Sequence, residues 1–274
     1  MTPTAAAEPV APWCEAFFAE DYLTVFGPFV EGQRARAEAA AVQTLLDVGP
    51  GARVLDLACG QGRHASPLRS AGLDVVGLDT SAVLLKAAAA RDPELALLRA
   101  DMRALPLADA CMDGVVNLFN AFGYFSSDEQ DVGVLREVAR VLRPGAVFVQ
   151  EVHHRDALVR DWEPRTVHPA YANGLIVTEE RRWDGVAGRH SVTYLLRQGT
   201  HGAVRRLDHE LRVYSLTELV ALHVRAGLEI LSVRGGLETS SPTPDTPLCV
   251  LVSRRPMSES PTSRAGITAA VSTP

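Results

Sequence analysis

The chain has 274 residues, 47% of them hydrophobic and 22% charged, a composition typical of one large domain with an added lobe, or of two small domains. Its formal net charge of −6 argues against a nucleic acid as the main partner, and no apolar run reaches the roughly eighteen residues that a membrane helix needs. The four cysteines show no C-x-x-C spacing and the N-terminus has no signal-peptide pattern, so we expect a soluble, cytoplasmic protein without a zinc site or disulfides.

Pro, Ser, Thr and Ala dominate both ends of the chain, and we expect residues 1–12 and 256–274 to be disordered. A short helix rich in aromatic residues is expected at residues 13–22. A longer, Ala-rich helix is expected at residues 33–48, where a Gly-Pro-Gly sequence ends it.

Strands and helices alternate along the next hundred residues. Strands are expected at 53–57, 74–78, 95–100, 114–118 and 146–152. Helices are expected between them at 63–71, 82–91 and 128–142. This alternation predicts a parallel sheet that is covered by helices on both faces.

The pattern changes after Gly174. Three expected strands are joined by turns without an intervening helix, at 174–183, 189–197 and 204–214. They predict an antiparallel meander. A helix at 215–226 follows, in which Ser215 and Glu218 are spaced for an N-terminal capping box. Two last strands, at 229–234 and 248–253, would complete the main sheet.

Together these elements predict an α/β fold: a Rossmann-like, seven-stranded, mostly parallel sheet with helices on both faces and an inserted antiparallel β lobe. Residues 13–152 and 215–255 would form the α/β domain, with the N-terminal helical segment as a lid. Residues 153–214 would form the lobe, which we expect to cap the substrate.

A turn with two glycines follows the first strand. Gly60 and Gly62 lack a Cβ, so a ligand can approach the backbone, and the start of the next helix offers N–H groups and a positive dipole end. Asp79 closes the second strand about twenty residues on, where an acidic residue usually binds ribose hydroxyls. With Asp56 before the turn, this arrangement predicts a nucleotide-type ligand and not a plain β-turn-α connection.

Four segments in this order resemble the class I S-adenosylmethionine-dependent methyltransferases: 54–62, 77–81, 100–106 and 138–146. A narrower similarity links three further segments, 20–23, 118–125 and 151–156, to small bacterial methyltransferases of natural products and sugars, which also carry an antiparallel lobe. Ala58 departs from the pattern, because many members have the first glycine of the turn there. Alanine is the smallest replacement, and we expect the turn to keep its function.

The resemblance implies a site for S-adenosylmethionine, with S-adenosylhomocysteine as product and no metal. Asp56 and the backbone at Ala58, Gly60 and Gly62 would hold the methionine end of the cofactor. Asp79 would accept hydrogen bonds from both ribose hydroxyls. The adenine side would be bound by Thr80, Ser81, Leu84, Asp101 and Met102. The other cofactor candidates are Tyr22, His64, Asn117, Leu118 and Phe119.

Methyl transfer requires the nucleophile, methyl group and sulfur to be aligned, and a base helps when the nucleophile is an amine or hydroxyl. His153 and His154 follow the fifth strand, at the edge of the sheet where ligands bind. Neighbours at a strand end face opposite sides, and we expect His154, which matches the family pattern, to be the base. Tyr22 and Tyr124 are the other catalytic candidates. The substrate candidates are Asn120, Glu151, His153, Arg155, Tyr171, Arg182, Arg212 and Tyr214.

The sequence thus predicts methyl transfer to nitrogen or oxygen, ahead of carbon, of a small molecule such as a secondary metabolite. The alternative is a protein of this fold that binds S-adenosylmethionine without methylating, in a rearrangement or a regulatory role. A nicotinamide dehydrogenase fits less well, because the turn lacks G-x-G-x-x-G. A metal-dependent enzyme would need a carboxylate cluster that the sequence does not show. The lobe is also a candidate homodimer surface, and neither a nucleic acid nor a membrane is expected as a partner.

Overall fold

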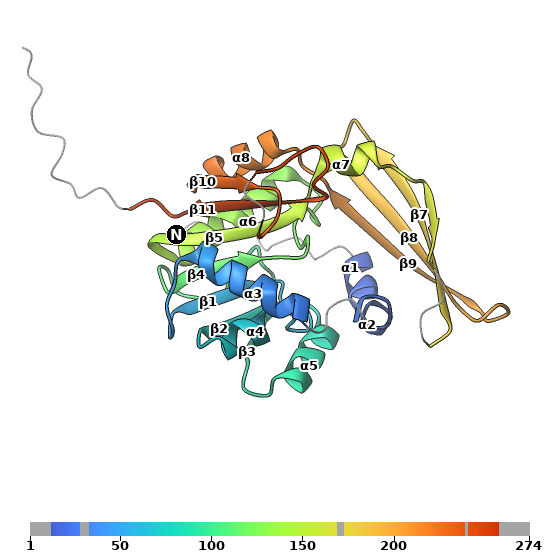
Figure 1. Ribbon diagram of the computed structural model, residues 1–274, viewed down its shortest axis with the longest axis horizontal. Helices are drawn as coiled ribbons and strands as arrows, with labels where there is room; N and C mark the ends of the chain where they lie inside the picture. The colour runs from blue at the N-terminus through green and yellow to red at the C-terminus, as the bar shows by residue number, and fades with distance from the viewer. Residues whose placement is uncertain (1–11, 28–32, 169–172, 239–240, 258–274) are drawn as a thin grey trace, which may run out of the picture.

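The computed structural model describes residues 12–27, 33–168, 173–238 and 241–257 (Figure 1). The disorder expected for residues 1–11 and 258–274 and the substrate contact expected for Tyr171 fall outside these residues. Pro12, which was expected to precede the folded part, begins the first helix. Within the described part of the chain, none of the helices has the length and apolar character needed to cross a membrane.

A seven-stranded sheet forms the centre of the α/β part, with the strand order β10-β11-β5-β4-β1-β2-β3. Its strands are β1 (Arg53–Leu57), β2 (Asp74–Asp79), β3 (Ala96–Arg99), β4 (Met112–Asn117), β5 (Leu142–His153), β10 (Glu229–Arg234) and β11 (Leu248–Arg254). The first five strands are parallel, and β11 runs antiparallel to both of its neighbours. The expected mostly parallel sheet is therefore confirmed.

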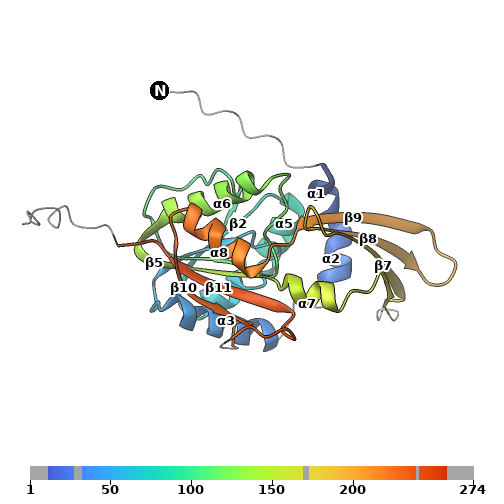
Figure 2. The same cartoon turned by 90° about the horizontal axis from the view of Figure 1, so that it is seen from above.

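Helices cover both faces of this sheet (Figure 2). One face packs against α6 (Asp128–Val141) and α8 (Leu216–Arg225), whose apolar side chains share a core cluster with Phe148 and Leu251. The other face packs against α3 (Gln33–Leu46) and α4 (Ala65–Ser70), and α5 (Ala82–Arg91) lies beside β2 and β3. Burial of the apolar faces of these helices stabilises the layers, by about 25 cal/mol for each Å² of apolar surface removed from water.

A second, four-stranded antiparallel sheet forms the lobe, as expected, with the order β6-β7-β8-β9. Its strands are β6 (Arg165–Val167), β7 (Leu175–Asp184), β8 (Arg189–Gln198) and β9 (Val204–Arg212). Neither β6 nor the helix α7 (Arg155–Arg160) was predicted from the sequence. Both are too short to show a periodic pattern.

The aromatic helix expected at residues 13–22 is two short helices, α1 (Pro12–Phe17) and α2 (Glu20–Phe26). They lie between the main sheet and the lobe (Figures 1 and 2). Their buried side chains and those of the lobe strands form one apolar group, here called the lobe cluster: Phe17, Val25, Leu175, Val177, Val192, Tyr194, Leu196 and Leu207. An ion pair of 2.5 Å between Asp21 and Arg205 adds to this contact.

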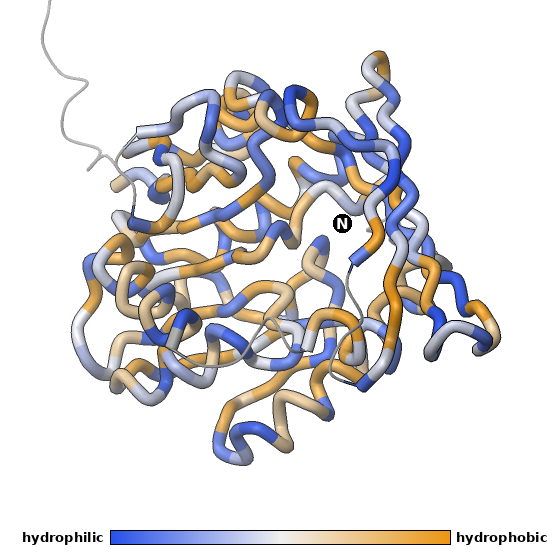
Figure 3. Tube along the Cα trace, turned by 45° about the vertical axis from the view of Figure 1, so that its right-hand side comes forward, coloured by the Kyte–Doolittle hydropathy of each residue, from blue (hydrophilic) through white to orange (hydrophobic). Residues whose placement is uncertain are grey.

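Hydropathy along the trace follows the same layers (Figure 3). The central strands are hydrophobic over most of their length, as expected for strands that are buried on both faces. β8 instead alternates, with buried His190, Val192, Tyr194 and Leu196 on one side. The lobe therefore presents one face to the rest of the molecule and one to solvent.

Candidate active site

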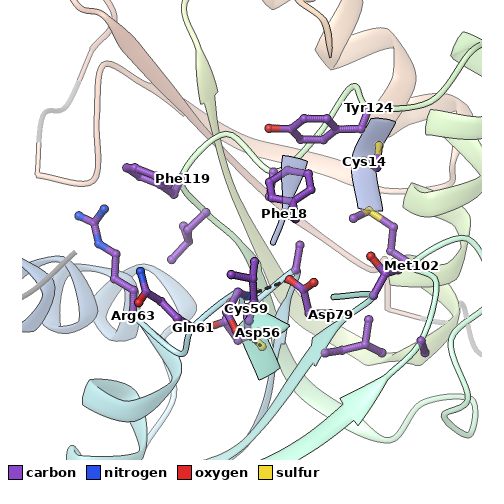
Figure 4. A pocket seen from close by; sticks show the side chains of 18 of the residues that line it. Cys14, Phe18, Asp56, Cys59, Gln61, Arg63, Asp79, Met102, Phe119 and Tyr124 are labelled. Atoms are coloured by element: carbon purple, nitrogen blue, oxygen red, sulfur yellow. Dashed lines mark hydrogen bonds between the residues drawn. The ribbon is translucent and has the colours of Figure 1, made fainter. Parts of the chain in front are cut away.

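Two cavities lie side by side where β1, β2, β4 and β5 end. The first cavity is built around the glycine turn after β1 and contains most of the residues that the sequence assigned to the cofactor: Tyr22, Asp56, Ala58, Gly60, His64, Asp79, Thr80, Leu84, Asp101, Met102, Leu118 and Phe119. Cys14, Phe18, Cys59, Gln61, Arg63 and Tyr124 also line it (Figure 4).

Three residues that were expected to contact the cofactor do not line the first cavity. A Cβ on Gly62 would lie 3.3 Å from Ala88, so this glycine lets α5 pack closely against the turn. Ser81 caps α5: its hydroxyl accepts the N–H of Leu84. The Asn117 side chain donates to the carbonyl of Leu57 and is buried within the sheet. Each of these residues supports the cavity without lining it.

The carboxylate of Asp79 joins the ends of β2 and β1. One oxygen accepts the N–H of Gly60 at 2.9 Å, and the other accepts the N–H of Ser81 at 2.8 Å. Burial raises the pKa of Asp79, and these backbone N–H groups act in the opposite direction. Ala58 and Gly60 both have left-handed φ angles, of 60° and 55°. The alanine therefore takes the conformation that a glycine would adopt more easily.

Three buried polar atoms in the first cavity have no hydrogen-bond partner among the described residues: Asp56 Oδ2, Gln61 Nε2 and Arg63 Nε. Burial raises the pKa of Asp56 to about 6. The unpartnered oxygen of Asp56 can accept hydrogen bonds from an ammonium group, and the two unpartnered nitrogens can donate to a carboxylate. The three atoms therefore fit the two charged groups of an amino acid. Figure 4 shows these three side chains together at one end of the cavity. Gln61 and Arg63 were not predicted, although both stand within the glycine turn.

At the other end of the first cavity, Asp101 accepts the backbone N–H of Arg103 at 2.8 Å and the Nη2 of the same residue at 2.6 Å. The guanidinium of Arg103 lies over the ring of Phe125, 4.5 Å from its centre. Asp101 thus lines the cavity as part of an ion pair, with Met102 beside it.

The turn after β4 is strained. Phe119 and Asn120, neither of them glycine, have left-handed φ angles of 56° and 60°. Hydrogen bonds to the end of β5 hold them: Phe119 N–H donates to the Glu151 carboxylate at 3.1 Å, and Asn120 Oδ1 accepts the N–H of His153 at 2.9 Å. The guanidinium of Arg63 lies 4.6 Å above the Phe119 ring.

Phe119 in this strained turn lines both the first and the second cavity. Tyr22 and Tyr124 also line both, so these three residues form the wall between the cavities. The second cavity has a volume of about 520 Å³ and lies between the strained turn, α7 and the inner face of the lobe. Of the predicted substrate residues, it contains Asn120, Glu151 and His153. Its other walls combine charged side chains with the aromatic rings of Phe17, Phe26, Trp162 and Tyr194.

His153, and not His154, faces the second cavity. The ring Nδ1 of His154 lies 2.9 Å from the carbonyl of Thr246, and its backbone N–H donates to Pro247. The expectation that His154 is the base is therefore wrong in its choice of residue, although the two neighbours do face opposite sides. Burial lowers the pKa of His153 to about 4, so its imidazole is neutral at pH 7.

Four other predicted substrate residues lie away from both cavities. Arg155 and Arg212 each pair with Glu218, at 2.9 and 2.7 Å, and Tyr214 donates to Asp131 at 2.6 Å. Arg182 is exposed on the outer face of β7, since its neighbour Arg181 lines the cavity. The first three residues join α6, α8 and the end of β9, and their role here is structural.

Sequence reasoning missed His190 on β8 and His209 on β9, which line the second cavity. Burial lowers their pKa values, to about 4 and about 3. His209 Nε2 lies 3.2 Å from the hydroxyl of Tyr124, whereas neither ring nitrogen of His190 has a hydrogen-bond partner among the described residues. The alternation of β8, which places His190 on the side of Val192 and Tyr194, is the signal that could have found it.

Comparison with known proteins supports the assignment of the first cavity. Residues 54–145 match a family described as a methyltransferase domain. A demethylmenaquinone methyltransferase of Renibacterium salmoninarum is 41% identical over 100 residues, 36% of this chain and 40% of its own length. This chain therefore spans only about two fifths of that relative.

Two further proteins match over most of their length. The dTDP-3-amino-3,4,6-trideoxy-alpha-D-glucopyranose N,N-dimethyltransferase of Streptomyces venezuelae is 26% identical over 79% of this chain and 93% of its own. The solved structure of the CcbJ methyltransferase from Streptomyces caelestis shares the fold with a TM-score of 0.72, at 23% identity over 81% of this chain and 89% of that one.

The glycine turn, the Asp79 carboxylate and the unpartnered polar atoms of the first cavity agree with these matches. Residues 54–145 therefore form a methyltransferase domain, and over most of its length the chain is similar to class I S-adenosylmethionine-dependent methyltransferases.

Proposed function

We propose that this protein transfers a methyl group from S-adenosylmethionine in the first cavity to an amine nitrogen of a small molecule in the second. The observation that carries this proposal is that the two cavities share a wall of Tyr22, Phe119 and Tyr124. A donor and an acceptor bound on either side of this wall would meet at it. Such positioning supplies much of the acceleration of a displacement reaction.

S-adenosylmethionine supplies a methyl group made electrophilic by its sulfonium. Asp56 would receive its ammonium group, and Gln61 and Arg63 its carboxylate, since these residues carry the unpartnered buried atoms. Asp79 would bind the ribose hydroxyls as a carboxylate acceptor. The backbone at Ala58 and Gly60 leaves room for this, because only Leu84, at 3.8 Å, would lie near a Cβ on Gly60.

His153 would orient the acceptor. Its neutral imidazole can accept a hydrogen bond from the attacking amine and so orient the amine lone pair toward the methyl group. Glu151, buried beside Phe119, adds a carboxylate that stabilises this charge. Nitrogen is favoured over oxygen because two relatives that match over most of their length are named as N,N-dimethyltransferases of amino sugars.

Two further predictions, on the location of the protein and on its assembly, accompany this proposal. The four cysteines are free thiols, which fits a cytoplasmic location. A homodimer through the lobe stays a prediction, which light scattering would test.

The proposal is tested by incubating the protein with S-adenosylmethionine and a panel of amine and hydroxyl metabolites. S-adenosylhomocysteine release and a mass gain of one methylene unit on an amine are the expected results. Calorimetric binding of S-adenosylmethionine without release in any mixture would favour the non-methylating alternative. Methylation at oxygen only would overturn the choice of nucleophile.

A further inference from the structure

The charges around the second cavity are strongly unequal. Its lining contains two arginines and five carboxylates, and the carboxylates are Glu38, Glu151, Asp161, Glu163 and Glu179. The three histidines of the lining are neutral at pH 7, since burial lowers the pKa of each. The cavity therefore carries a net negative charge, which attracts cations and repels anions.

Both arginines are already bound to carboxylates. Arg34 Nε lies 2.8 Å from Glu38 Oε1 at the exposed rim. Arg181 pairs with Glu179 and donates to the Thr166 hydroxyl at 2.6 Å. Among the described residues, the lining contains no lysine and no further arginine. A phosphate would therefore have to displace a carboxylate to gain a cation.

Glu151 contrasts with the carboxylates that are ion-paired. It is buried, with 7% of its surface exposed, and it accepts a hydrogen bond from Phe119 N–H. No salt bridge to Glu151 occurs among the described residues. Burial raises the pKa of Glu151, and the positive charge of Arg63 lowers it only in part. A buried carboxylate without a direct salt bridge is costly, so a protonated amine that entered the cavity would be stabilised beside it.

His190 marks a second contact point. Its side chain is 6% exposed, with the ring of Trp162 against it at 5.4 Å. Because a neutral imidazole has one N–H donor and one lone pair, and both nitrogens lack partners among the described residues, a bound hydroxyl group could satisfy either. A buried, unsatisfied imidazole that faces a cavity indicates recognition of a polar ligand.

We propose that the acceptor is a phosphate-free amine with at least one hydroxyl group, bound with its nitrogen toward Glu151 and its hydroxyl toward His190. This inference rests on the proposed function. It separates this protein from the Streptomyces venezuelae relative, whose name gives a nucleotide-linked sugar. The diphosphate of such a compound would meet the carboxylates of the second cavity.

The test uses thymidine diphosphate as a probe of the second cavity, measured by calorimetry on the protein saturated with S-adenosylhomocysteine. We expect the wild type to bind thymidine diphosphate only in the millimolar range. The substitution Glu179→Gln leaves Arg181 without its carboxylate, and binding of the diphosphate should become at least about tenfold tighter. Glu180→Gln is the matched control, because Glu180 is the exposed neighbour on the opposite face of β7, and it should leave binding unchanged.

Micromolar binding of thymidine diphosphate to the wild type would overturn the inference, and so would an unchanged affinity in a folded Glu179→Gln protein. A matched pair of acceptors adds a second readout: an amino sugar linked to thymidine diphosphate and the same sugar as its methyl glycoside. Preferential methylation of the linked form would contradict the inference while leaving the proposed function intact. Failure of S-adenosylhomocysteine to bind at all would instead contradict the proposed function.

Discussion

Asp79 Oδ2 accepts the backbone N–H of Gly60 at 2.9 Å, and this hydrogen bond joins the end of β2 to the turn that ends β1. The same carboxylate accepts the N–H of Ser81 at the start of α5. Three chain segments therefore meet at the Asp79 side chain. This side chain determines the shape of the first cavity as well as its charge.

Replacement of Asp79 by Asn should weaken binding of S-adenosylmethionine by about ten- to hundredfold, because charge-assisted hydrogen bonds to the ribose become neutral ones. Asp74→Asn is the control. Asp74 begins the same strand at its opposite, exposed end, where it pairs with Arg53. Calorimetry on both variants checks the prediction, and an Asp79→Asn protein with wild-type affinity would remove this residue from the cofactor site.

His153→Ala should lower kcat by about tenfold or more, because the acceptor loses the hydrogen bond that orients it, while cofactor binding is unchanged. His154→Ala should keep kcat near that of the wild type, because its ring contacts the Thr246 carbonyl and not the cavity. Steady-state kinetics on the two variants gives the comparison. The opposite ranking would restore His154 as the base.

Phe119→Gly tests the wall between the cavities. Relief of the left-handed strain, roughly 1–2 kcal/mol, should offset the greater backbone entropy of glycine and the lost contact with Arg63. Unfolding by urea should therefore show a change in stability of less than about 1 kcal/mol. kcat/KM should nevertheless fall by about tenfold or more, since the ring no longer positions donor and acceptor. A loss of both stability and activity would mean that the ring acts through the fold alone.

The stability of the protein should depend on His223, which is fully buried on α8. Its Nε2 must donate to Gln150 Oε1 at 2.9 Å, so its Nδ1 accepts from the Ser253 hydroxyl at 3.0 Å. Burial lowers its pKa from 6.5 to about 3. Between these values the unfolded chain binds a proton that the folded chain does not, so stability falls as the pH decreases, by about 1.4 kcal/mol per pH unit.

Asp56 and Asp131 act with the opposite sign. Burial raises their pKa values to about 6 and about 7, so the folded protein gains stability as they become protonated. The contribution of His223 is therefore isolated by comparing urea unfolding of the wild type and His223→Gln at pH 7.5, 6 and 5. The variant should lose less stability per pH unit. His201→Gln, at an exposed turn of the lobe, serves as the control. Equal slopes in the wild type and His223→Gln would refute the assignment.

Local sequence patterns were enough to predict the elements that carry the cofactor site. The bounds of β1, α5 and β10 agree with the expected ones, because strand periodicity, an N-cap and a glycine turn are encoded by neighbouring residues. The place of Asp79 follows from the same local pattern. This part of the fold needs no knowledge of distant contacts.

The acceptor side depends on long-range packing, and the sequence predicted it less well. Whether His153 or His154 faces the cavity is decided by the pairing of β5 with β11, which sets His153 opposite Leu248. Strand periodicity shows which lobe residues share a face, but not which face is covered. For this reason Arg182 was expected in the site and His190 was missed.

The packing of α1 and α2 against the lobe has a consequence for how the chain is made. The ring of Phe17 lies 5.8 Å from that of Tyr194, and Asp21 pairs with Arg205. The helices α1 and α2 thus have their apolar partners on β8 and β9, which are translated much later. Contacts of such sequence separation form slowly, and exposed aromatic helices favour aggregation until then. The docking of α1 and α2 against the lobe therefore requires that β9 has already been synthesised.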